Sequence, residues 1–93
     1  MRTIERSGAF KRDYKREAKG QRRLGLDEAL VSVLTLLVND KPLKPYQRDH
    51  DLIVNWSGYR ECHIKPDLLL IYRKSKDDTL QLVRLGSHSQ LFG

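Results

Sequence analysis

The fold is decided by residues 65–78, which read KPDLLLIYRKSKDD. Leu68 to Tyr72 is apolar without alternation, a pattern typical of a central strand covered by helices on one face and partly covered on the other. Polar turns lie on both sides of this run, and connections this short join neighbouring antiparallel strands. The expected strands are Gly58–Ile64, Leu68–Lys74 and Leu80–Leu85.

The first half of the chain follows helical periodicity instead. A short strand is expected at Thr3–Arg6, and Ser7 is suited to cap a helix that runs from about Gly8 to Arg22. A second helix, from about Leu26 to Val38, carries leucine and valine along one side, so we expect it to be the main buried helix. Prolines at positions 42 and 45 then mark a loop.

Length and composition describe a single domain, residues 1–93, with one modest core. Cys62 is the only cysteine, which excludes an internal disulfide and a Cys-x-x-Cys metal or redox pair and fits a reducing cytoplasm. No apolar run has the length needed to span a bilayer, and no signal peptide is visible. We therefore expect a cytoplasmic protein with no membrane partner.

Positive charge is concentrated in the first quarter of the chain. Residues 1–23 contain nine lysines and arginines against three carboxylates, whereas the remaining residues contain nine of each sign. Most of these cations recur at helical spacing, so they are expected to form one basic face. Such a face can bind a polyanion or be merely solvated, and the charge pattern leaves both readings open. The basic face comprises Lys11, Arg12, Lys15, Arg16, Lys19, Arg22 and Arg23.

Three histidines, His50, His63 and His88, all lie in the second half of the chain. In an antiparallel sheet, His63, Asp67 and Arg84 could meet near one edge, while His50 and His88 lie in flanking loops that close over them. RNA cleavage without a metal needs a base for the 2′-hydroxyl, an acid for the departing 5′-oxygen and a cation facing the charged phosphorane. Histidine, aspartate and arginine meet those three needs.

Two other function classes compete with a ribonuclease. A zinc-dependent hydrolase is one, since the three histidines, or two of them with Asp67, supply suitable ligands. No local pair such as His-x-x-x-His is present, which counts against that class. A nucleic-acid-binding module without catalysis is the other, because each histidine alone is more often a surface or hydrogen-bonded residue.

Aromatic side chains near the histidines also have two readings each. Trp56 and Tyr59 could stack on bases, but we expect Trp56 to be a core residue. Phe92 is suited equally to core packing and to stacking on a base.

Several segments of the second half carry a family resemblance. They are residues 49–52 (DHDL), 56–67 (WSGYRECHIKPD), 70–72 (LIY) and 84–93 (RLGSHSQLFG). Together they resemble the YafQ family of the RelE superfamily, toxins of bacterial type II toxin–antitoxin pairs. The order of basic helix, apolar helix, loop and three-stranded sheet also fits, so the resemblance spans essentially the whole chain.

The resemblance implies an α+β fold with two N-terminal helices packed on one face of a small, mainly antiparallel sheet. It implies a ribosome-dependent endoribonuclease that cuts mRNA in the decoding site and inhibits translation, with neither a metal nor an organic cofactor. The implied partners are a DinJ-like antitoxin, the ribosome with its mRNA, and operator DNA for the toxin–antitoxin complex. The implied catalytic residues are His50, His63, Asp67 and His88, and the implied substrate-binding residues are Arg84 and Phe92.

Within that family, roles can be assigned to these side chains. We expect His50 or Asp67 to be the base and His88 the acid, with His63 and Arg84 stabilising the developing charge. The basic face is expected to contact ribosomal RNA and, in the inhibited complex, the antitoxin.

Two positions depart from the family pattern. Leu68 stands where relatives often carry an aromatic residue, so substrate stacking at this position is not expected. Cys62 replaces a commonly small residue, and its strand parity points away from His63, so we expect it to pack in the core.

Overall fold

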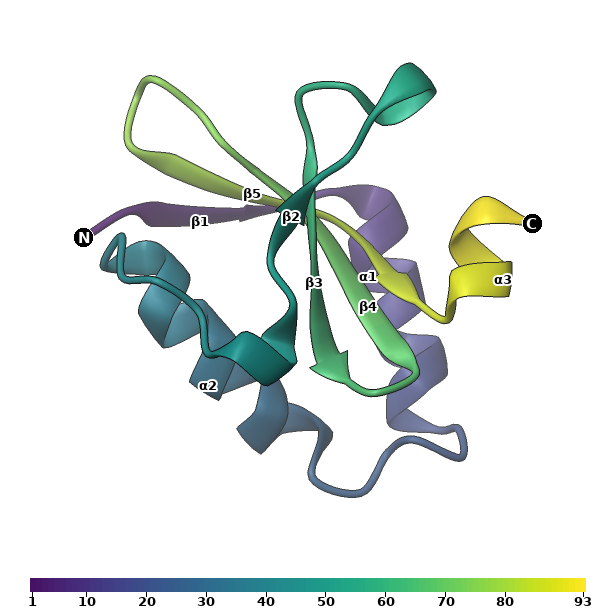
Figure 1. The fold of residues 1–93 in the computed structure, drawn as a ribbon. Helices are drawn as coiled ribbons and strands as arrows, with labels where there is room; N and C mark the ends of the chain where they lie inside the picture. Colours follow the sequence, from purple (N-terminus) through teal and green to yellow (C-terminus); the bar gives the residue numbers. More distant parts are fainter.

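The longest apolar run of the chain forms the middle of the sheet. The computed structural model describes all 93 residues, with β4 (Leu68–Lys74) at the centre of a five-stranded sheet of order β1-β5-β4-β3-β2 (Figure 1). β3 (Arg60–Lys65) and β5 (Thr79–Gly86) pair antiparallel with β4. β2 (His50–Asp51) extends the sheet antiparallel to β3, and β1 (Thr3–Arg6) lies parallel to β5. The expected mainly antiparallel α+β fold is confirmed.

The two longer helices cover one face of this sheet. α1 (Gly8–Ala18) and α2 (Leu26–Val38) lie on this face (Figure 1). They contribute to a main core of 14 buried residues, together with one side of β3, β4 and β5. The short helix α3 (His88–Phe92) lies against the other face, where it buries a smaller cluster with β4. The 3-10 turns η1 (Pro45–Gln47) and η2 (Val54–Trp56) flank β2. No helix combines the length and the apolar character that crossing a bilayer requires.

Burial on both faces explains why β4 lacks alternation. Leu68, Leu70 and Tyr72 belong to the main core, whereas Leu69 and Ile71 belong to the smaller cluster. Leu68 is fully buried, so it has no access to a substrate, as its departure from the family pattern led us to expect. β4 therefore holds two layers together, and both of its faces must be apolar.

The predicted boundaries of helices and strands agree best with the structure where the sequence carries a strong local signal, such as a helix cap or a clear periodicity. β1 and α2 have the expected bounds, and the Ser7 hydroxyl caps α1 by accepting from the Phe10 amide at 2.9 Å. α1 is shorter than expected and ends at Ala18, because the amides of Lys19 and Gly20 turn back to carbonyls three residues earlier. The last two arginines of the basic face are therefore outside the helix.

Two short elements were not predicted. β2 and α3 have two and five residues, too few for their periodicity to be read from sequence. His50 therefore lies on a strand and His88 begins a helix, although both were expected in loops. β3 begins at Arg60 rather than Gly58, since Gly58 has a φ of 92°, outside strand geometry.

Side chains around α1 cover the part of β5 that β1 leaves open. β1 pairs only as far as Leu82. Beyond it, the Ser7 hydroxyl donates to the Val83 carbonyl (2.7 Å) and the Leu85 amide donates to Asp13 (3.0 Å). Arg16 Nη2 donates to the Leu85 carbonyl at 2.8 Å. These contacts satisfy backbone groups that would otherwise remain unpaired at a sheet edge.

Candidate active site

Three neighbouring hollows form one groove along β3. The central hollow, about 430 Å³, lies between β3 and the start of α3. It shares Glu61 and His88 with the aromatic hollow (about 280 Å³), and it shares His63 and Pro66 with the Arg48 hollow (about 340 Å³). The central hollow is lined by Glu61, His63, Pro66, Asp67, Leu69, Ser87, His88 and Ser89. The aromatic hollow is lined by His50, Leu52, Ile53, Trp56, Glu61, His88 and Phe92. The Arg48 hollow is lined by Tyr46, Arg48, His63, Ile64, Lys65 and Pro66.

The groove brings together most of the residues singled out from the sequence. His63 and Asp67 line the central hollow, His50 and Phe92 line the aromatic hollow, and His88 lies between the two. These five side chains come from β2, β3, the β3–β4 turn and α3. Tertiary structure thus gathers groups that are up to 42 positions apart in the chain.

Glu61 lines the groove, although the sequence assigned it no role. It extends from β3 on the same side as His63, and its side chain is only 8% exposed. Its Oε1 lies 3.4 Å from His50 Nε2 on the neighbouring strand β2, where the two residues are register partners. The strand parity shared with His63 was the signal that could have identified it.

The ring of His50 is held at both nitrogens. Its Nδ1 lies 2.8 Å from the Arg48 carbonyl, while its Nε2 faces Glu61. A carbonyl only accepts hydrogen bonds, so Nδ1 carries a proton and donates to Arg48, while Nε2 lies within ion-pair distance of the Glu61 carboxylate. The geometry therefore fixes the orientation of the His50 ring and places a carboxylate where it would stabilise a positive charge on that ring.

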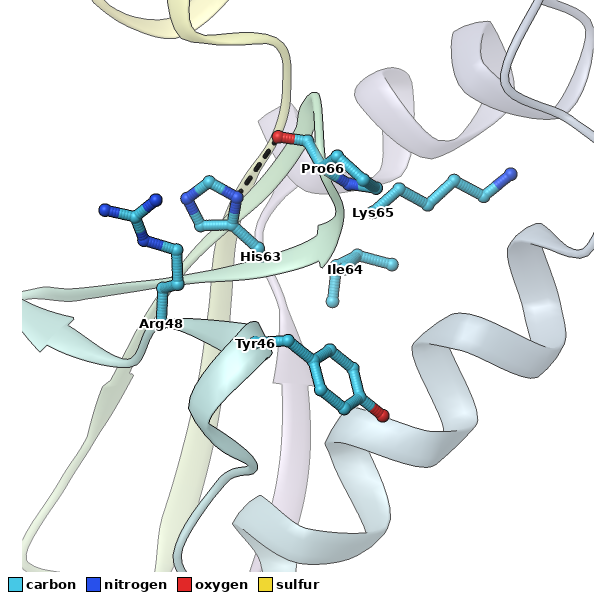
Figure 2. A pocket seen from close by; sticks show the side chains of 6 residues that line it. All are labelled: Tyr46, Arg48, His63, Ile64, Lys65 and Pro66. Atoms are coloured by element: carbon cyan, nitrogen blue, oxygen red, sulfur yellow. Dashed lines mark hydrogen bonds between the residues drawn. The ribbon is translucent and has the colours of Figure 1, made fainter.

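His63 is held at one nitrogen only. Its Nδ1 lies 3.2 Å from the Pro66 carbonyl in the β3–β4 turn, and the rest of the ring projects into the groove (Figure 2). Because the carbonyl can only accept, Nδ1 carries the proton and Nε2 of the neutral ring keeps a free lone pair. This nitrogen is in position to take a proton from a bound molecule.

His88 occupies the first residue of α3 and is exposed. A capping box holds this end of the helix: the Ser87 hydroxyl accepts from the Gln90 amide (3.2 Å), and Gln90 Oε1 accepts from the Ser87 amide (2.8 Å). The His88 ring lies 5.1 Å from that of Phe92. The imidazole is therefore attached to a helix end that is held in place by the capping box, but the residue itself is exposed to solvent.

Aromatic rings form one wall of the groove. Trp56 makes edge contacts with Tyr59 (5.6 Å) and with Phe92 (6.1 Å). Trp56 was expected in the core, but it is only partly buried. It packs on the smaller cluster and does not belong to the main core. Phe92 is likewise half-buried, and one part of its ring packs while another lines the aromatic hollow.

Two arginines of the expected basic face are committed to ion pairs instead. Arg22 Nε donates to Glu17 at 2.9 Å, Nη1 to Asp67 at 3.2 Å, and Nη2 to Gln90 of α3 at 3.2 Å. Arg16 pairs with Asp13 at 2.9 Å. The expectation of one uniform basic face is therefore wrong for these two residues, because two carboxylates of α1 are almost fully buried beneath them.

Arg84 has a different place from the one expected. It lines none of the three hollows, and its guanidinium donates to Asp13 at 2.7 and 3.2 Å. Burial by itself raises the pKa of Asp13, but hydrogen bonds from Arg84 and the Leu85 amide, with the charges of Arg84 and Arg16, outweigh it and leave the pKa below its ordinary value. Arg84 does not meet His63 and Asp67; it joins β5 to α1.

The other basic residues of the N-terminal segment remain exposed and form no ion pair. They are Lys11, Arg12, Lys15, Lys19 and Arg23. In this structure no three His, Cys, Asp or Glu side chains are grouped so as to hold a metal ion, so the set considered from the sequence for zinc is not assembled. Cys62 is fully buried in the main core, and burial raises the pKa of its thiol, which agrees with a packing role.

Comparison with known proteins identifies the family. Residues 2–93 match the family described as the bacterial toxin of type II toxin-antitoxin system, YafQ. The chain belongs to the YafQ toxin family. An mRNA interferase toxin YafQ from an Escherichia coli B strain is 41% identical over 94 residues, which cover 100% of this chain and 98% of that relative. The toxin of the same name from Escherichia coli K12 is 40% identical over the same share of both chains.

Solved structures of YafQ-like toxins share the fold. A metal-bound toxin from Helicobacter pylori has 46% identity and a TM-score of 0.87, covering 99% of this chain and all of the other. A chain of the Escherichia coli DinJ-YafQ complex has 39% identity and a TM-score of 0.84, with all of both chains covered. The resemblance to the YafQ family read from the sequence is confirmed.

Proposed function

We propose that this YafQ-family toxin is a ribosome-dependent endoribonuclease that cleaves mRNA in the decoding site and so inhibits translation in the cytoplasm. The observation that carries the proposal is the groove along β3, which gathers three histidines, two carboxylates and the aromatic rings of Trp56 and Phe92. Relatives about 40% identical over the whole chain are named mRNA interferase toxins, which supports the same reaction class.

The reaction uses the RNA's own 2′-hydroxyl as the nucleophile. A base removes the hydroxyl proton, and the oxygen attacks the adjacent phosphorus while the bond from phosphorus to the 5′-oxygen breaks. An acid donates a proton to that leaving oxygen. The products are a 2′,3′-cyclic phosphate and a 5′-hydroxyl, and the protein as a whole neither gains nor loses a proton.

Geometry favours His63 as the base and His88 as the acid. The free Nε2 of His63 is suited to accept the 2′-hydroxyl proton, and exposed His88 lies across the central hollow from it. His50 and Asp67, the bases expected from the sequence, are held by Glu61 and by Arg22 respectively. We assign His50 to stabilising the charge of the phosphorane. Asp67 is assigned to holding the β3–β4 turn of the groove in place through its ion pair with Arg22.

Phe92 is assigned to stacking on a base, since its ring edges the aromatic hollow beside His88. Arg84 is assigned to holding α1 against β5, because its guanidinium is occupied by Asp13. This chemistry is proposed to need no metal ion. One relative is described as metal-bound, so dependence on a metal is part of the test below.

The partners follow from the family and from the remaining charge. A DinJ-like antitoxin is the proposed inhibitor, since the YafQ of the Escherichia coli complex is 39% identical and covers the whole chain. The exposed cations of α1 that form no ion pair are suited to ribosomal RNA. The toxin–antitoxin complex is proposed to bind operator DNA.

The test is mRNA cleavage on programmed ribosomes with an empty decoding site, in magnesium buffer, by toxin that was first stripped with EDTA and then freed of the chelator, with the cut mapped by primer extension. We expect the wild type to cleave and His88→Ala to lose about 100-fold or more in rate, because a general acid contributes about 10² to 10⁴. Lys76→Gln, in the β4–β5 turn at the far end of the sheet, is the control and should cleave like the wild type.

The other outcomes point to the competing classes. A folded wild type that binds ribosomes but does not cleave would be a non-catalytic RNA-binding module. Activity that is lost when the toxin is stripped with EDTA and returns with added zinc would indicate a metal-dependent hydrolase, which zinc analysis of the active protein would check. Cleavage that is unchanged in His88→Ala would exclude this residue as the acid.

A further inference from the structure

The Arg48 hollow lies beside the proposed catalytic base and has no assigned occupant. It wraps around the free edge of β3 beyond the point where β2 ends, because β2 pairs only with Arg60 and Glu61. His63 and Pro66 line both this hollow and the central one. In the Arg48 hollow, the His63 ring lies between Arg48 and Pro66 (Figure 2). A bound chain that passes His63 can therefore continue into the Arg48 hollow without leaving the groove.

Arg48 supplies a cation that is free to bind an anion. Its side chain is exposed, forms no ion pair, and extends beside the ring of His63 (Figure 2). Arg22 and Arg84, by contrast, are bound to carboxylates. Arg48 is the only arginine that lines any of the three hollows. Its guanidinium is therefore the one available to bind a phosphate in the groove.

The backbone holds Arg48 in an uncommon conformation. Its φ is 51° and its ψ is 51°, a left-handed geometry that costs a residue with a side chain about 1 kcal/mol or more. The Arg48 amide donates to the Pro45 carbonyl at 3.2 Å, and its carbonyl faces His50 Nδ1 at 2.8 Å. The same residue thus places a guanidinium next to one histidine and orients another.

Tyr46 supplies an exposed aromatic surface on the same short turn. The residue is 69% exposed, and it lines the Arg48 hollow. Buried Gln47 fixes the turn beneath it, since its Oε1 accepts from the Lys44 amide at 2.8 Å. An aromatic ring left in solvent on a rigid turn is suited to stack on an unpaired base.

We propose that the Arg48 hollow binds the nucleotide on the 5′ side of the scissile phosphate, with Arg48 on its own 5′-phosphate and Tyr46 stacked on its base. The direction of the strand follows from the proposed function, on which this inference rests. His63 takes the proton of the attacking 2′-hydroxyl, so the nucleotide that carries this hydroxyl lies on the His63 side. His88 serves the leaving 5′-oxygen, so the following nucleotide lies toward the aromatic hollow.

The test combines variants of the protein with mRNAs that lack one base. Two substrates carry an abasic ribonucleotide, one immediately 5′ and the other immediately 3′ of the cut, and the decoding site contains no tRNA. On intact mRNA, Tyr46→Ala should lower kcat/KM about tenfold, mainly through KM, because stacking is lost. Tyr46→Phe should behave like the wild type, since the ring is retained.

The abasic substrates decide whether the ring meets that base. On the 5′-abasic mRNA, Tyr46→Ala should cleave as well as the wild type, whereas the tenfold difference should persist on the 3′-abasic mRNA. Arg48→Gln should lower kcat/KM on all three substrates, and Arg48→Lys should recover part of the loss because it keeps the charge. Both variants keep a side chain at the strained position, so they are matched for backbone effects, and Lys76→Gln again controls for loss of one positive charge.

The inference and the proposed function fail in different ways. If the wild type does not cleave, the proposed function is wrong and the inference falls with it. If the wild type cleaves but Tyr46→Ala is equally active on intact mRNA, or is equally impaired on both abasic substrates, the hollow does not bind the 5′ base. That result would overturn the inference alone.

Discussion

Glu61 lies on the largely buried strand β3, and its carboxylate faces His50. A buried carboxylate is costly unless it is paired, so the contact between Glu61 and His50 is expected to stabilise a particular orientation of the ring as well as the charge. The neighbouring Cys62 lies on the opposite side of β3 and is fully enclosed. One face of β3 therefore carries side chains of the groove and the other carries side chains of the core, so adjacent residues have unrelated roles.

Glu61→Gln should lower the rate of mRNA cleavage about tenfold, which corresponds to a coupling of about 1.4 kcal/mol. The amide keeps the shape of the side chain but removes the charge that faces His50. Adding the substitution to His50→Ala should produce little further loss, because the two residues act as a unit. Measuring the four rates of this cycle checks the prediction, and losses that simply multiply would show that Glu61 acts independently of His50.

Among the elements, α3 is tied to the rest of the molecule by Gln90, which accepts from Arg22 of the α1–α2 connection at 3.2 Å and from Arg16 at 3.5 Å. Arg22 reaches α1 through Glu17, the β3–β4 turn through Asp67 and α3 through Gln90. α3 has only five residues, and helices this short do not form in isolation. Its position, and with it that of His88, therefore depends on contacts with Arg22 and with the apolar cluster beneath.

Arg22→Gln should lower the free energy of unfolding by about 2 kcal/mol, since Glu17 is buried and would lose its main partner. Amide hydrogen exchange in α3 should also become faster. The matched control is Arg23→Gln, whose guanidinium reaches only the Gly20 carbonyl and which should change stability by no more than about 0.5 kcal/mol. Urea unfolding of both variants provides the comparison, and equal effects would argue against the role given to Arg22.

At the scale of the whole molecule, the buried carboxylate of Asp13 joins the helix layer to the sheet, because it links α1 to β5. Asp13 accepts from Arg84, Arg16 and the Leu85 amide, and its pKa in the folded protein lies below the ordinary value. A carboxyl group with a lowered pKa in the folded state stabilises that state fully above its ordinary pKa of about 4. The stabilisation is lost as the pH falls through the lower value of the folded state.

Asp13→Asn should therefore destabilise the protein by about 3 kcal/mol near pH 7, where the wild-type carboxylate is charged. The difference from the wild type should shrink as the pH is lowered below about 4 and through the lowered pKa of the folded state, because the wild type then loses the same interaction. Urea unfolding across this range tests the sign. Glu28→Gln, an exposed carboxylate without an ion pair, should change stability little at any pH, and a constant difference for Asp13→Asn would contradict the assignment.

By itself, the sequence determined the layers of this protein. The unbroken apolar run of β4, the cap at Ser7 and the periodicity of α2 are local patterns, so β1, α2 and β4 have the bounds expected of them. The family motifs also identified most of the groove, since His50, His63, Asp67, His88 and Phe92 all line it.

Tertiary structure alone decided which charges are free and which are used. Arg16, Arg22 and Arg84 look like open cations in the sequence, but carboxylates bind them: Asp13 of the same helix pairs with Arg16, and carboxylates of other elements pair with Arg22 and Arg84. Arg48 and Glu61 line the groove although the sequence assigned neither of them a role. β2 and α3 exist because β3 and the small cluster stabilise them, not because of their own propensity. The physical reason is range: local patterns fix secondary structure, whereas ion pairs join residues up to 71 positions apart and form only after the chain has folded.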